Sequence, residues 1–455
     1  MAWYEVLPEL KSPVKKLSFN TKLGWTLAAL TMYFVLSHIP LYGLSPAYKT
    51  QFEALAVLLA ASFGSIISLG IGPIVTASIV LQLLNSAGVL NIDTNTTDGK
   101  KKYQAFQKVF ALAFVVFENA LYVMSGALPS ATGTLPVQVL MIIQLIIGGV
   151  ILMFLDELTS KWGFGSGISL FIAAGVSIQI ITNGFNPFPD PNNPALPAGQ
   201  AFKVIAFLLQ GNFEAMIWPL VTILATVLVF AIVVYLQAMK VEIPLSFGRV
   251  RGFSIKWPLK FIYTSNMPVI LVAALIASMS FWGLMLANMG LPLLGQFEEQ
   301  SDGGQPVAVS GLAKYINPPT LRKIVVNPEM DDFISFFVYL SFMSLGAVVF
   351  SLLWMNIGGQ DPSSVADQIM DSKLQIPGFR QDKRIITRLL SRYILPLTVL
   401  GGFSVGLLAA FADLLGALSR GTGILLAVMI IYQLYEQIAQ QHSHDMPDFL
   451  RRFMK

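Results

Sequence analysis

The sequence predicts an all-α integral membrane protein with ten transmembrane helices in two inverted halves of five. Three observations predict this class. Hydrophobic residues make up 55% of the 455 residues and charged residues only 12%, whereas soluble domains carry about 25% charge. Apolar stretches near the roughly 20 residues that cross a bilayer recur along the chain. Basic residues gather at both termini and in alternate loops, as expected of cytoplasmic segments.

The predicted spans are separated by connections of varied length, among them two long basic loops and a long polar loop at 290–331. They are 24–44, 73–89, 109–128, 136–158, 166–184, 215–238, 261–289, 332–356, 392–414 and 421–439. We divide the chain into an N-terminal half, 1–184, and a C-terminal half, 185–455, which carries the basic loops 239–260 and 357–392. Because 23 of the 29 Lys and Arg residues fall on one side, we expect a multi-pass cell-membrane protein with both termini in the cytoplasm.

Composition excludes several kinds of site. The chain has no cysteine and only three histidines, so disulfides, thiolate metal sites and a histidine-rich metal centre are not expected. No segment ends in the GK[ST] pattern with which a Walker motif cradles phosphate. We therefore expect no metal, no cofactor and no enzyme, and a source of energy outside the chain. The N-terminus also lacks the pattern of a signal peptide.

The stretch 54–84 is almost entirely apolar but contains Gly70, Gly72 and Pro73 in its middle. As one helix it would reach about 46 Å, beyond a hydrocarbon core of roughly 30 Å. In one interpretation residues 54–68 fold back as a re-entrant helix and 73–89 complete the span. In the other, one long tilted helix has a proline kink. Broken backbone is tolerated in a membrane only where protein or a water-filled cavity covers it, so the first interpretation predicts a cavity.

Glycine-rich breaks also open the fifth span of each half, at 163–167 and 421–423, and Pro268 lies in the seventh span. Matching breaks in inverted halves are typical of a functional site near the midplane. The residues that follow the breaks carry no charge. They can form an apolar constriction that seals by dewetting, or they can be ordinary core residues; the candidates are Ile71, Val75, Ile168, Ile172, Ile270 and Leu426.

Glu118 lies within the third predicted span. An ionisable group at that depth is costly and predicts a functional site, although a protonated carboxyl bonded to a neighbouring helix is a compatible structural role. An inverted-repeat secondary transporter of a small solute is the alternative function, but Glu118 has no obvious basic partner for ion coupling. An intramembrane hydrolase would need two acids in facing spans. The other candidates lie at span ends, where hydration is cheap: His38, Asp156, Glu157 and Asp413.

Five segments carry a resemblance to a known family: SLGIGPIVTASIVLQLL (68–84), KWGFGSGISLFIAAGVS (161–177), VEIPLSFGRVRG (241–252), GFR (378–380) and GTGILLAVMIIYQLYEQ (421–437). They resemble the SecY family of protein-conducting channels, and the IPLSFGRVRG form is similar to archaeal members. The resemblance covers almost the whole chain. It implies a SecY-like fold that opens sideways and a passive channel in the Sec translocon. Such a channel translocates signal-bearing nascent polypeptides and releases transmembrane segments laterally into lipid.

The resemblance also implies roles for individual residues. The six apolar candidates match the family's pore ring, with Ile71 at the narrowest point. A plug helix at about 54–67 would include Ala54, Leu58, Ala61, Phe63, Gly64, Ile66 and Ile67. A lateral gate would include Thr76, Gln82, Glu118 and Ser278. Archaeal relatives usually carry Asn in place of Ser278, and Ser offers fewer hydrogen bonds.

The partners that the resemblance implies are a ribosome with its nascent polypeptide, the signal-recognition-particle pathway, membrane lipid, and two small subunits, SecE and a beta subunit, in a heterotrimer. The basic loops would contact rRNA phosphates, with which arginine pairs in bidentate fashion. Such binding should weaken steeply with salt. The ribosome-binding candidates are Arg249, Arg251, Lys256 and Arg380.

Overall fold

The computed structural model describes residues 9–15, 17–45, 64–86, 88–90, 92, 96–124, 128–190, 193–247, 254–264, 267–288, 292–298, 307–317, 319–372, 374–375, 382–419 and 421–442. The chain forms two compact units. Unit 1 comprises Met1–Ser177, Glu299–Gln305 and Ile430–Lys455, and unit 2 comprises Ile178–Glu298 and Pro306–Met429. The division into halves after residue 184 stays a prediction.

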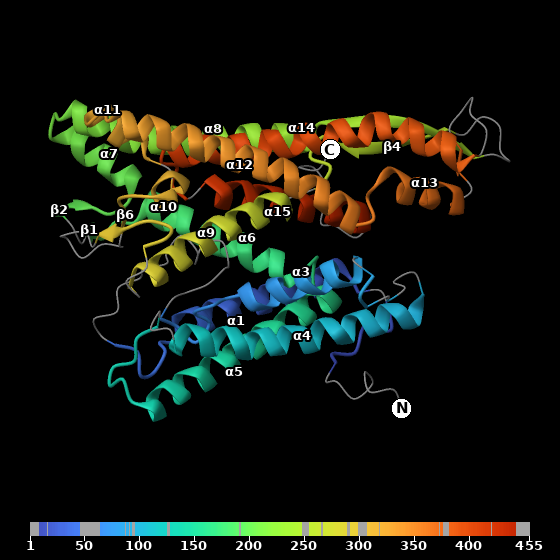
Figure 1. Cartoon of the computed structure of the whole chain (residues 1–455), viewed down its shortest axis with the longest axis horizontal. Coiled ribbons are helices and arrows are strands. Elements are labelled where there is room, and N and C mark those ends of the chain that lie inside the picture. Colours follow the sequence, from blue (N-terminus) through green and yellow to red (C-terminus); the bar gives the residue numbers. More distant parts are fainter. Residues whose placement is uncertain are drawn as a thin grey trace. The chain divides into compact units, whose positions relative to one another are not determined.

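Unit 1 is a helical bundle. Its helices are α1 (Phe19–His38), α3 (Gly72–Ser86), α4 (Thr97–Met124) and α5 (Leu135–Trp162), joined by the first part of α6 (Gly167–Phe185) and the last part of α15 (Gly421–His442). Within it α4 packs against both α3 and α5, and α1 packs against α5 (Figure 1). One apolar cluster of this unit consists of Leu41, Val123, Leu128, Met141 and Leu145.

Unit 2 is built around a second group of helices. The long ones are α8 (Phe213–Ala238), α9 (Met267–Asn288), α12 (Met330–Ile357) and α14 (Lys383–Leu414). Shorter helices are α7 (Gln200–Leu209), α10 (Leu312–Ile316), α11 (Leu321–Val326) and α13 (Pro362–Asp371). Helix α12 packs on α14 and α9. Small residues permit this approach, since an added Cβ at Gly406 would lie 2.7 Å from the Met343 carbonyl oxygen.

The two basic loops meet in a three-stranded sheet ordered β4–β3–β7. Strand β3 (Lys240–Phe247) pairs antiparallel with β4 (Ser254–Lys260) and with β7 (Leu374–Gln375). A small apolar core forms beneath the sheet from Ile243, Leu259, Met355, Val365, Ala366, Ile369, Ile386, Leu390, Ile394 and Leu397. Two further antiparallel pairs join β1 (Pro189–Asp190) to β2 (Asn193–Pro197) and β5 (Phe297–Glu298) to β6 (Val307–Ala308).

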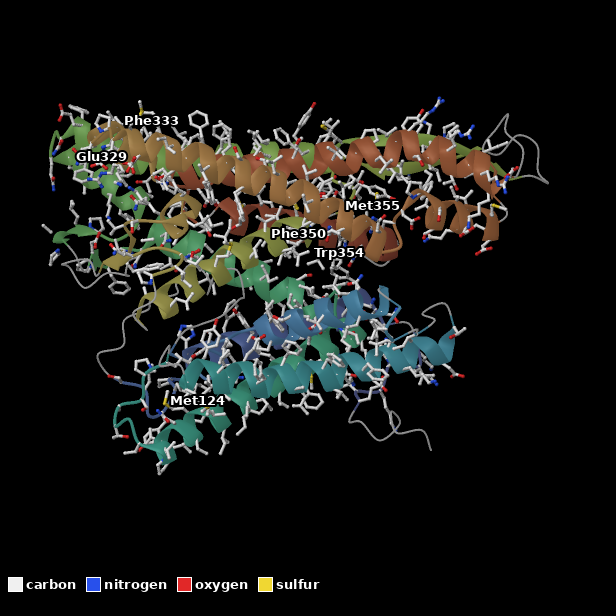
Figure 2. The ribbon with its side chains drawn as sticks, viewed as in Figure 1. Met124, Glu329, Phe333, Phe350, Trp354 and Met355 are labelled. Atoms are coloured by element: carbon white, nitrogen blue, oxygen red, sulfur yellow. The ribbon has the colours of Figure 1, made fainter. Side chains whose placement is uncertain are left out.

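Each predicted span overlaps a helix, and the fold is a helical membrane fold. Among the described residues, seven helices are long and apolar enough to cross a membrane: Lys101–Met124, Leu135–Trp162, Gly167–Phe185, Phe213–Ala238, Met330–Asn356, Lys383–Leu414 and Gly421–Ala439. Large apolar side chains are exposed on such helices, including Met124 at the end of α4 and Phe333 on α12 (Figure 2). Apolar surface of this kind fits a lipid environment.

Some helix ends differ from the predicted spans. Helix α14 begins at Lys383, well before the predicted start at 392, and α4 begins at Thr97 rather than 109. Hydropathy shows only where the apolar stretch ends. The helix itself continues past that point, because charged side chains there can reach water. Helix α7 has no counterpart among the predicted spans, because its 10 residues are too few to cross a membrane.

Candidate functional site

The broken segment lies in unit 1, and the break is a run of turns between residues 64 and 71. Gly64 and Gly70 have φ of +88° and +55°, a region that favours glycine. Helix α3 starts at Gly72, which places Pro73 in the first turn, where its missing N–H costs nothing. The interpretation as one long helix with a proline kink is therefore wrong, because no helix continues back through these turns.

The turns are held against the segment that follows α1 and against α5. Leu41 N–H donates to the Gly64 carbonyl oxygen at 2.7 Å, and Ile66 N–H donates to the Ile39 carbonyl oxygen at 3.1 Å. On the α5 side Gly148 leaves room for the turn, since an added Cβ there would lie 2.1 Å from the Ile66 carbonyl oxygen. The start of α3 is thus fixed by backbone contacts on two sides.

The predicted plug falls mostly outside the described residues. Ala54, Leu58, Ala61 and Phe63 lie outside them, so their arrangement stays a prediction. Gly64, Ile66 and Ile67 lie within the turns, so the re-entrant helix does not reach residue 68 as expected. The reason is the backbone itself, because Gly64 and Gly70 take positive φ values at which a right-handed helix does not continue.

Four of the six pore-ring candidates lie in unit 1. Ile71 is buried at the start of α3, and Val75 N–H donates to its carbonyl oxygen at 3.0 Å, so the two side chains share one helical face. Ile168 and Ile172 repeat this spacing in the first turns of α6. Ile172 is buried, whereas Val75 and Ile168 are half-buried.

The other two ring candidates lie in unit 2, Ile270 on α9 and Leu426 on α15, and both are buried. Their neighbours Val269 and Leu425 belong to the main apolar cluster of that unit, which includes neither Ile270 nor Leu426. The side chains of Ile270 and Leu426 therefore lie outside this cluster, as expected if they line a different surface. The ring of six as a whole stays a prediction.

Part of the predicted lateral gate is brought together on neighbouring helices. Thr76 on α3 interacts with the Glu118 carboxyl on α4, while its hydroxyl donates to the Gly72 carbonyl oxygen at 3.0 Å. A second polar bond joins these helices, since Gln107 Nε2 donates to Ser78 Oγ at 2.9 Å. Gln82 is half-buried on α3. Ser278 lies on α9 of unit 2, and its side chain is outside the described residues, so its place in the gate stays a prediction.

One of the four predicted ribosome-binding residues, Lys256, lies in the three-stranded sheet. Lys256 on β4 is exposed and pairs with Glu242 on β3 at 2.8 Å. This ion pair lowers the pKa of the Glu242 carboxyl and raises that of the Lys256 ammonium. Arg249, Arg251 and Arg380 lie outside the described residues. Pairing of β3 with β7 explains why both basic loops have more order than topology alone requires.

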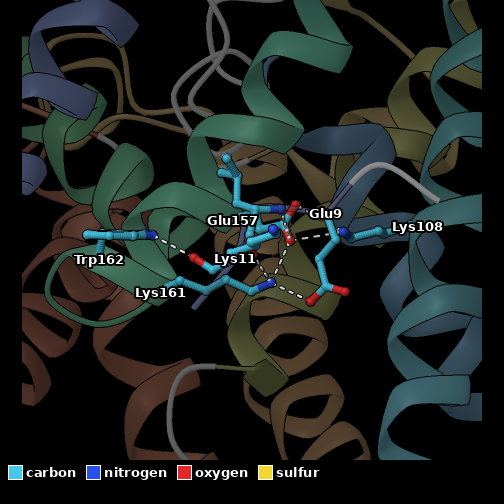
Figure 3. A network of polar contacts seen from close by, with 7 residues as sticks. Glu9, Lys11, Lys108, Glu157, Lys161 and Trp162 are labelled. Atoms are coloured by element: carbon cyan, nitrogen blue, oxygen red, sulfur yellow. Dashed lines mark hydrogen bonds and ion pairs between the residues drawn. The ribbon is translucent and has the colours of Figure 1, made fainter. Parts of the chain in front are cut away.

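A polar network that the sequence analysis missed ties the segment before α1 to the end of α5 (Figure 3). Glu157, whose side chain is 12% exposed, binds Lys108 at 2.9 Å and Lys161 at 2.8 Å. It also accepts the Leu10 N–H at 3.2 Å. Trp162 Nε1 donates to the Lys11 carbonyl oxygen at 3.0 Å. In the sequence, only the i, i+4 spacing of Glu157 and Lys161 could have predicted part of this network.

Lys161 also hydrogen-bonds Glu9, which lowers the pKa of the Glu9 carboxyl below its ordinary value of 4.5. Because the folded pKa is lower than the unfolded one, this contact stabilises the fold above pH 4.5. The contribution is lost as the pH falls through the lowered pKa. We expect it to be small, since the Glu9 side chain is more than half exposed.

Replacing Glu157 with glutamine should destabilise unit 1 by roughly 1–3 kcal/mol, because two half-buried ammonium groups lose their shared carboxylate. The measurement is thermal unfolding of the purified protein in detergent. Glu214→Gln is the matched control, since Glu214 is exposed in the first turn of α8. Equal melting temperatures for the two variants would contradict a stabilising role for the network.

Two further acids, Asp156 and Asp413, are less exposed to water than expected. Asp156 and Asp413 are half-buried rather than freely hydrated, and both accept backbone N–H groups at the start of the following helix. Hydropathy could not distinguish a capping acid from a solvated one. Within the described residues, no group of three or more His, Asp or Glu side chains is arranged to hold a metal ion.

Comparison with known families places these features in context. The SecY family model matches residues 65–435, and a model of the plug domain of Sec61p matches residues 32–64. The chain is 44% identical to the protein translocase subunit SecY of Methanothermobacter thermautotrophicus, over 99% of this chain and 97% of that protein. It is 40% identical to the SecY subunit of Methanocaldococcus jannaschii, over 96% and 95% of the two chains.

Solved structures give the same result. A structure of a protein conducting channel has a TM-score of 0.79 and 39% identity, and the match covers 97% of each chain. Sec61 in a canine ribosome–channel complex from the endoplasmic reticulum has a TM-score of 0.76 and 38% identity, again over 97% of each chain. The similarity extends over both units and the segments that connect them.

Proposed function

Because this chain belongs to the SecY family of protein-conducting channels, which translocate polypeptides across membranes, we propose that it passes signal-bearing nascent chains and releases apolar segments laterally into lipid. The protein is a multi-pass membrane protein and a non-enzymatic channel. Membership of the family removes the transporter and hydrolase alternatives. We also propose that the protein resides in the cell membrane with both termini in the cytoplasm.

The fixed start of α3 is the observation that carries the proposed pore. The turns at 64–71 are bonded to the segment after α1, and they deliver Ile71 and Val75 on one face. We infer that Ile71 and Val75 form an apolar ring together with Ile168, Ile172, Ile270 and Leu426. Such a ring excludes water and ions, yet yields to polypeptide side chains of many shapes because it makes no specific polar contacts.

The same turns support the proposed plug. A segment that ends in a rigid turn at Gly64 can move as a unit without disturbing α3, since the bonds to Leu41 and Ile39 hold the turn itself. We propose that residues 54–63 block the resting channel and leave it during transport. The match of residues 32–64 to the plug domain model supports this assignment.

Thr76 and Glu118 support a lateral gate that includes α3 and α4. Their interaction offsets part of the cost of a carboxyl within a membrane span. We propose that α3 and α4 separate from the helices that carry Ser278 and its neighbours when an apolar segment leaves for lipid. The Thr76–Glu118 contact joins two helices on the same side of the proposed gate, so it can persist when that side moves.

The three-stranded sheet is the proposed ribosome-binding surface. Sec61 in the canine complex is a ribosome-bound relative of this chain, and β3 and β4 carry the segment that contains Arg249 and Arg251 between them. We propose contacts to rRNA phosphates there, together with partner subunits equivalent to SecE and the beta subunit, delivery by the signal-recognition-particle pathway and energy from chain elongation. To contact phosphate, Lys256 would have to break its ion pair with Glu242.

Reversing Arg249 and Arg380 to glutamate should weaken ribosome binding by about tenfold or more, since each reversal removes an attraction to phosphate and adds a repulsion. Co-sedimentation of ribosomes with the reconstituted channel across a salt series measures this. Lys314→Glu is the control, because Lys314 lies on α10, outside the basic loops. Undiminished binding with an unchanged salt dependence would remove these arginines from the surface.

Translocation itself tests the proposed function. The reconstituted protein with its partner subunits is presented with a stalled or elongating ribosome–nascent chain complex. Protection of a signal-bearing chain from added protease, and none of the same chain without its signal, is the expected result. Equal protection of both chains would contradict selection of signal-bearing clients, and transport of a small solute coupled to an ion would contradict the passive channel.

A further inference from the structure

The helices that carry three of the ring residues, α6 and α15, start in the same way. Each follows a short linker after a long helix, α5 or α14, and each starts with a glycine, Gly167 or Gly421. The first backbone N–H groups of a helix have no partner within it and must be satisfied otherwise. The two helices satisfy them with matched side chains from other helices.

In unit 1 the matched residues are Asp156 and Thr26. Asp156 Oδ1, on α5, accepts the Ile168 N–H at 2.9 Å, and the Gly167 N–H and the Ser166 hydroxyl also bond to this carboxyl. Thr26 Oγ1, on α1, accepts the Phe164 N–H of the linker at 3.0 Å. Thr26 is 5% exposed and donates its own hydroxyl proton to the Lys22 carbonyl oxygen.

In unit 2 the corresponding residues are Asp413 and Thr226. Asp413 Oδ1, on α14, accepts the Gly421 N–H at 2.7 Å, and its other oxygen accepts the Tyr339 hydroxyl at 2.6 Å. Thr226 Oγ1, on α8, accepts the Leu418 N–H of the linker at 2.9 Å. Thr226 is 8% exposed and donates to the Thr222 carbonyl oxygen, four residues back, as Thr26 does.

The two linkers also make equivalent contacts: each lies against the later part of the other linker's helix, α6 or α15. In unit 2 the α14–α15 linker bonds to the later part of α6, where Asn183 Nδ2 donates to the Leu418 carbonyl oxygen at 2.9 Å and Ser419 Oγ donates to Gln179 at 2.8 Å. In unit 1 the α5–α6 linker lies against the later part of α15, since an added Cβ at Gly165 would lie 3.2 Å from the Gln437 side chain.

Steric fit supports a fixed position for both helix starts. A Cβ added at Gly167 would lie 2.6 Å from the Asp156 Cα, and one at Gly421 would lie 2.3 Å from the Ala409 carbonyl oxygen. Glycine therefore allows each helix start to approach the preceding helix closely. A buried threonine that accepts a linker N–H is costly to replace, because the N–H would then lose its partner.

We propose that Thr26 with Asp156, and Thr226 with Asp413, form two equivalent clamps that position the starts of α6 and α15 and so set the width of the closed constriction. The clamp in unit 1 acts directly on a ring residue, since the N–H that Asp156 binds belongs to Ile168. The four side chains are positioning residues, because none belongs to the proposed ring. The effect on the constriction rests on the proposed function; the clamps themselves do not.

The test compares Thr26→Val, Asp156→Asn and Asp156→Ala with the wild type, in the full chain with its partner subunits. Thr31→Val is the matched control, since Thr31 on the same helix bonds only to the Leu27 carbonyl oxygen in the same i−4 pattern. Amide hydrogen exchange over residues 163–172 reports the clamp, and ion conductance of the resting channel in planar bilayers reports the constriction. Translocation by the wild-type protein reports the proposed function separately.

We expect Thr26→Val and Asp156→Ala to accelerate exchange at the start of α6 by about tenfold or more and to raise resting conductance several-fold. Asp156→Asn should have a smaller effect because the amide keeps an acceptor oxygen, and Thr31→Val should change neither quantity. Unchanged exchange in both Thr26→Val and Asp156→Ala would overturn the clamp. Faster exchange with unchanged conductance would overturn its role in the constriction, while a wild-type protein that translocates would leave the proposed function intact.

Discussion

Serine in place of Ile71, Ile168 and Ile270 is expected to raise the ion conductance of the resting channel by about tenfold or more. Each replacement removes a large apolar side chain from the proposed constriction and adds a hydroxyl that holds water. An apolar constriction seals because water leaves it, so added polarity and added width act in the same direction. Planar-bilayer recordings of the reconstituted channel, without a nascent chain, measure the leak.

The control for the serine replacements is Ile147→Ser, because Ile147 is an exposed isoleucine on α5 that faces away from the unit's core. It should leave the leak unchanged, since its side chain lies on the outer surface of its helix. An unchanged leak in the three ring variants would place these isoleucines in ordinary apolar core and leave the seal to other residues.

Gly148→Ala is expected to have the second large effect. The new Cβ would meet the Ile66 carbonyl oxygen at 2.1 Å, so the turn that precedes α3 must shift. Overpacking of this kind costs about 1–3 kcal/mol. Because the turn fixes the start of α3, we also expect a higher resting leak. Thermal unfolding in detergent and conductance in bilayers measure the two effects on one preparation.

Gly24→Ala is the matched substitution for comparison. Gly24 lies within α1, and an added Cβ there has nothing within 4 Å. Alanine should therefore be neutral or slightly stabilising through its higher helix propensity. If Gly148→Ala melts at the same temperature as Gly24→Ala and does not leak, then the turn is not held against α5 in the membrane.

The sequence predicts the parts of this fold that depend on local pattern. Stretches of apolar residues locate the spans, and the cluster of Gly70, Gly72 and Pro73 locates a real break. Because the chain has no cysteine, the sequence also excludes disulfides. The position of Glu118 within an apolar stretch indicates a polar contact, which the structure supplies through Thr76.

The features that the sequence does not reveal depend on contacts between distant segments. Thr26 and Phe164 are 138 residues apart, and Thr226 and Leu418 are 192 apart. A threonine in an apolar helix normally satisfies its own hydroxyl on the preceding turn, so nothing in the pattern marks these two as acceptors. The same holds for Asp156 and Asp413, which hydropathy assigns to solvent, and for Glu157, which binds partners from three segments.

The most direct test of the proposed pore is site-specific photocrosslinking. A photoreactive residue replaces Ile71, Ile168 or Ile270, one at a time, in the channel reconstituted with its partner subunits, and a stalled ribosome–nascent chain complex with a signal sequence is added. We expect the translocating chain to crosslink to all three positions and not to the same probe at Ile147. Absence of crosslinks from the three positions while the ribosome complex is bound would contradict a polypeptide path lined by this ring.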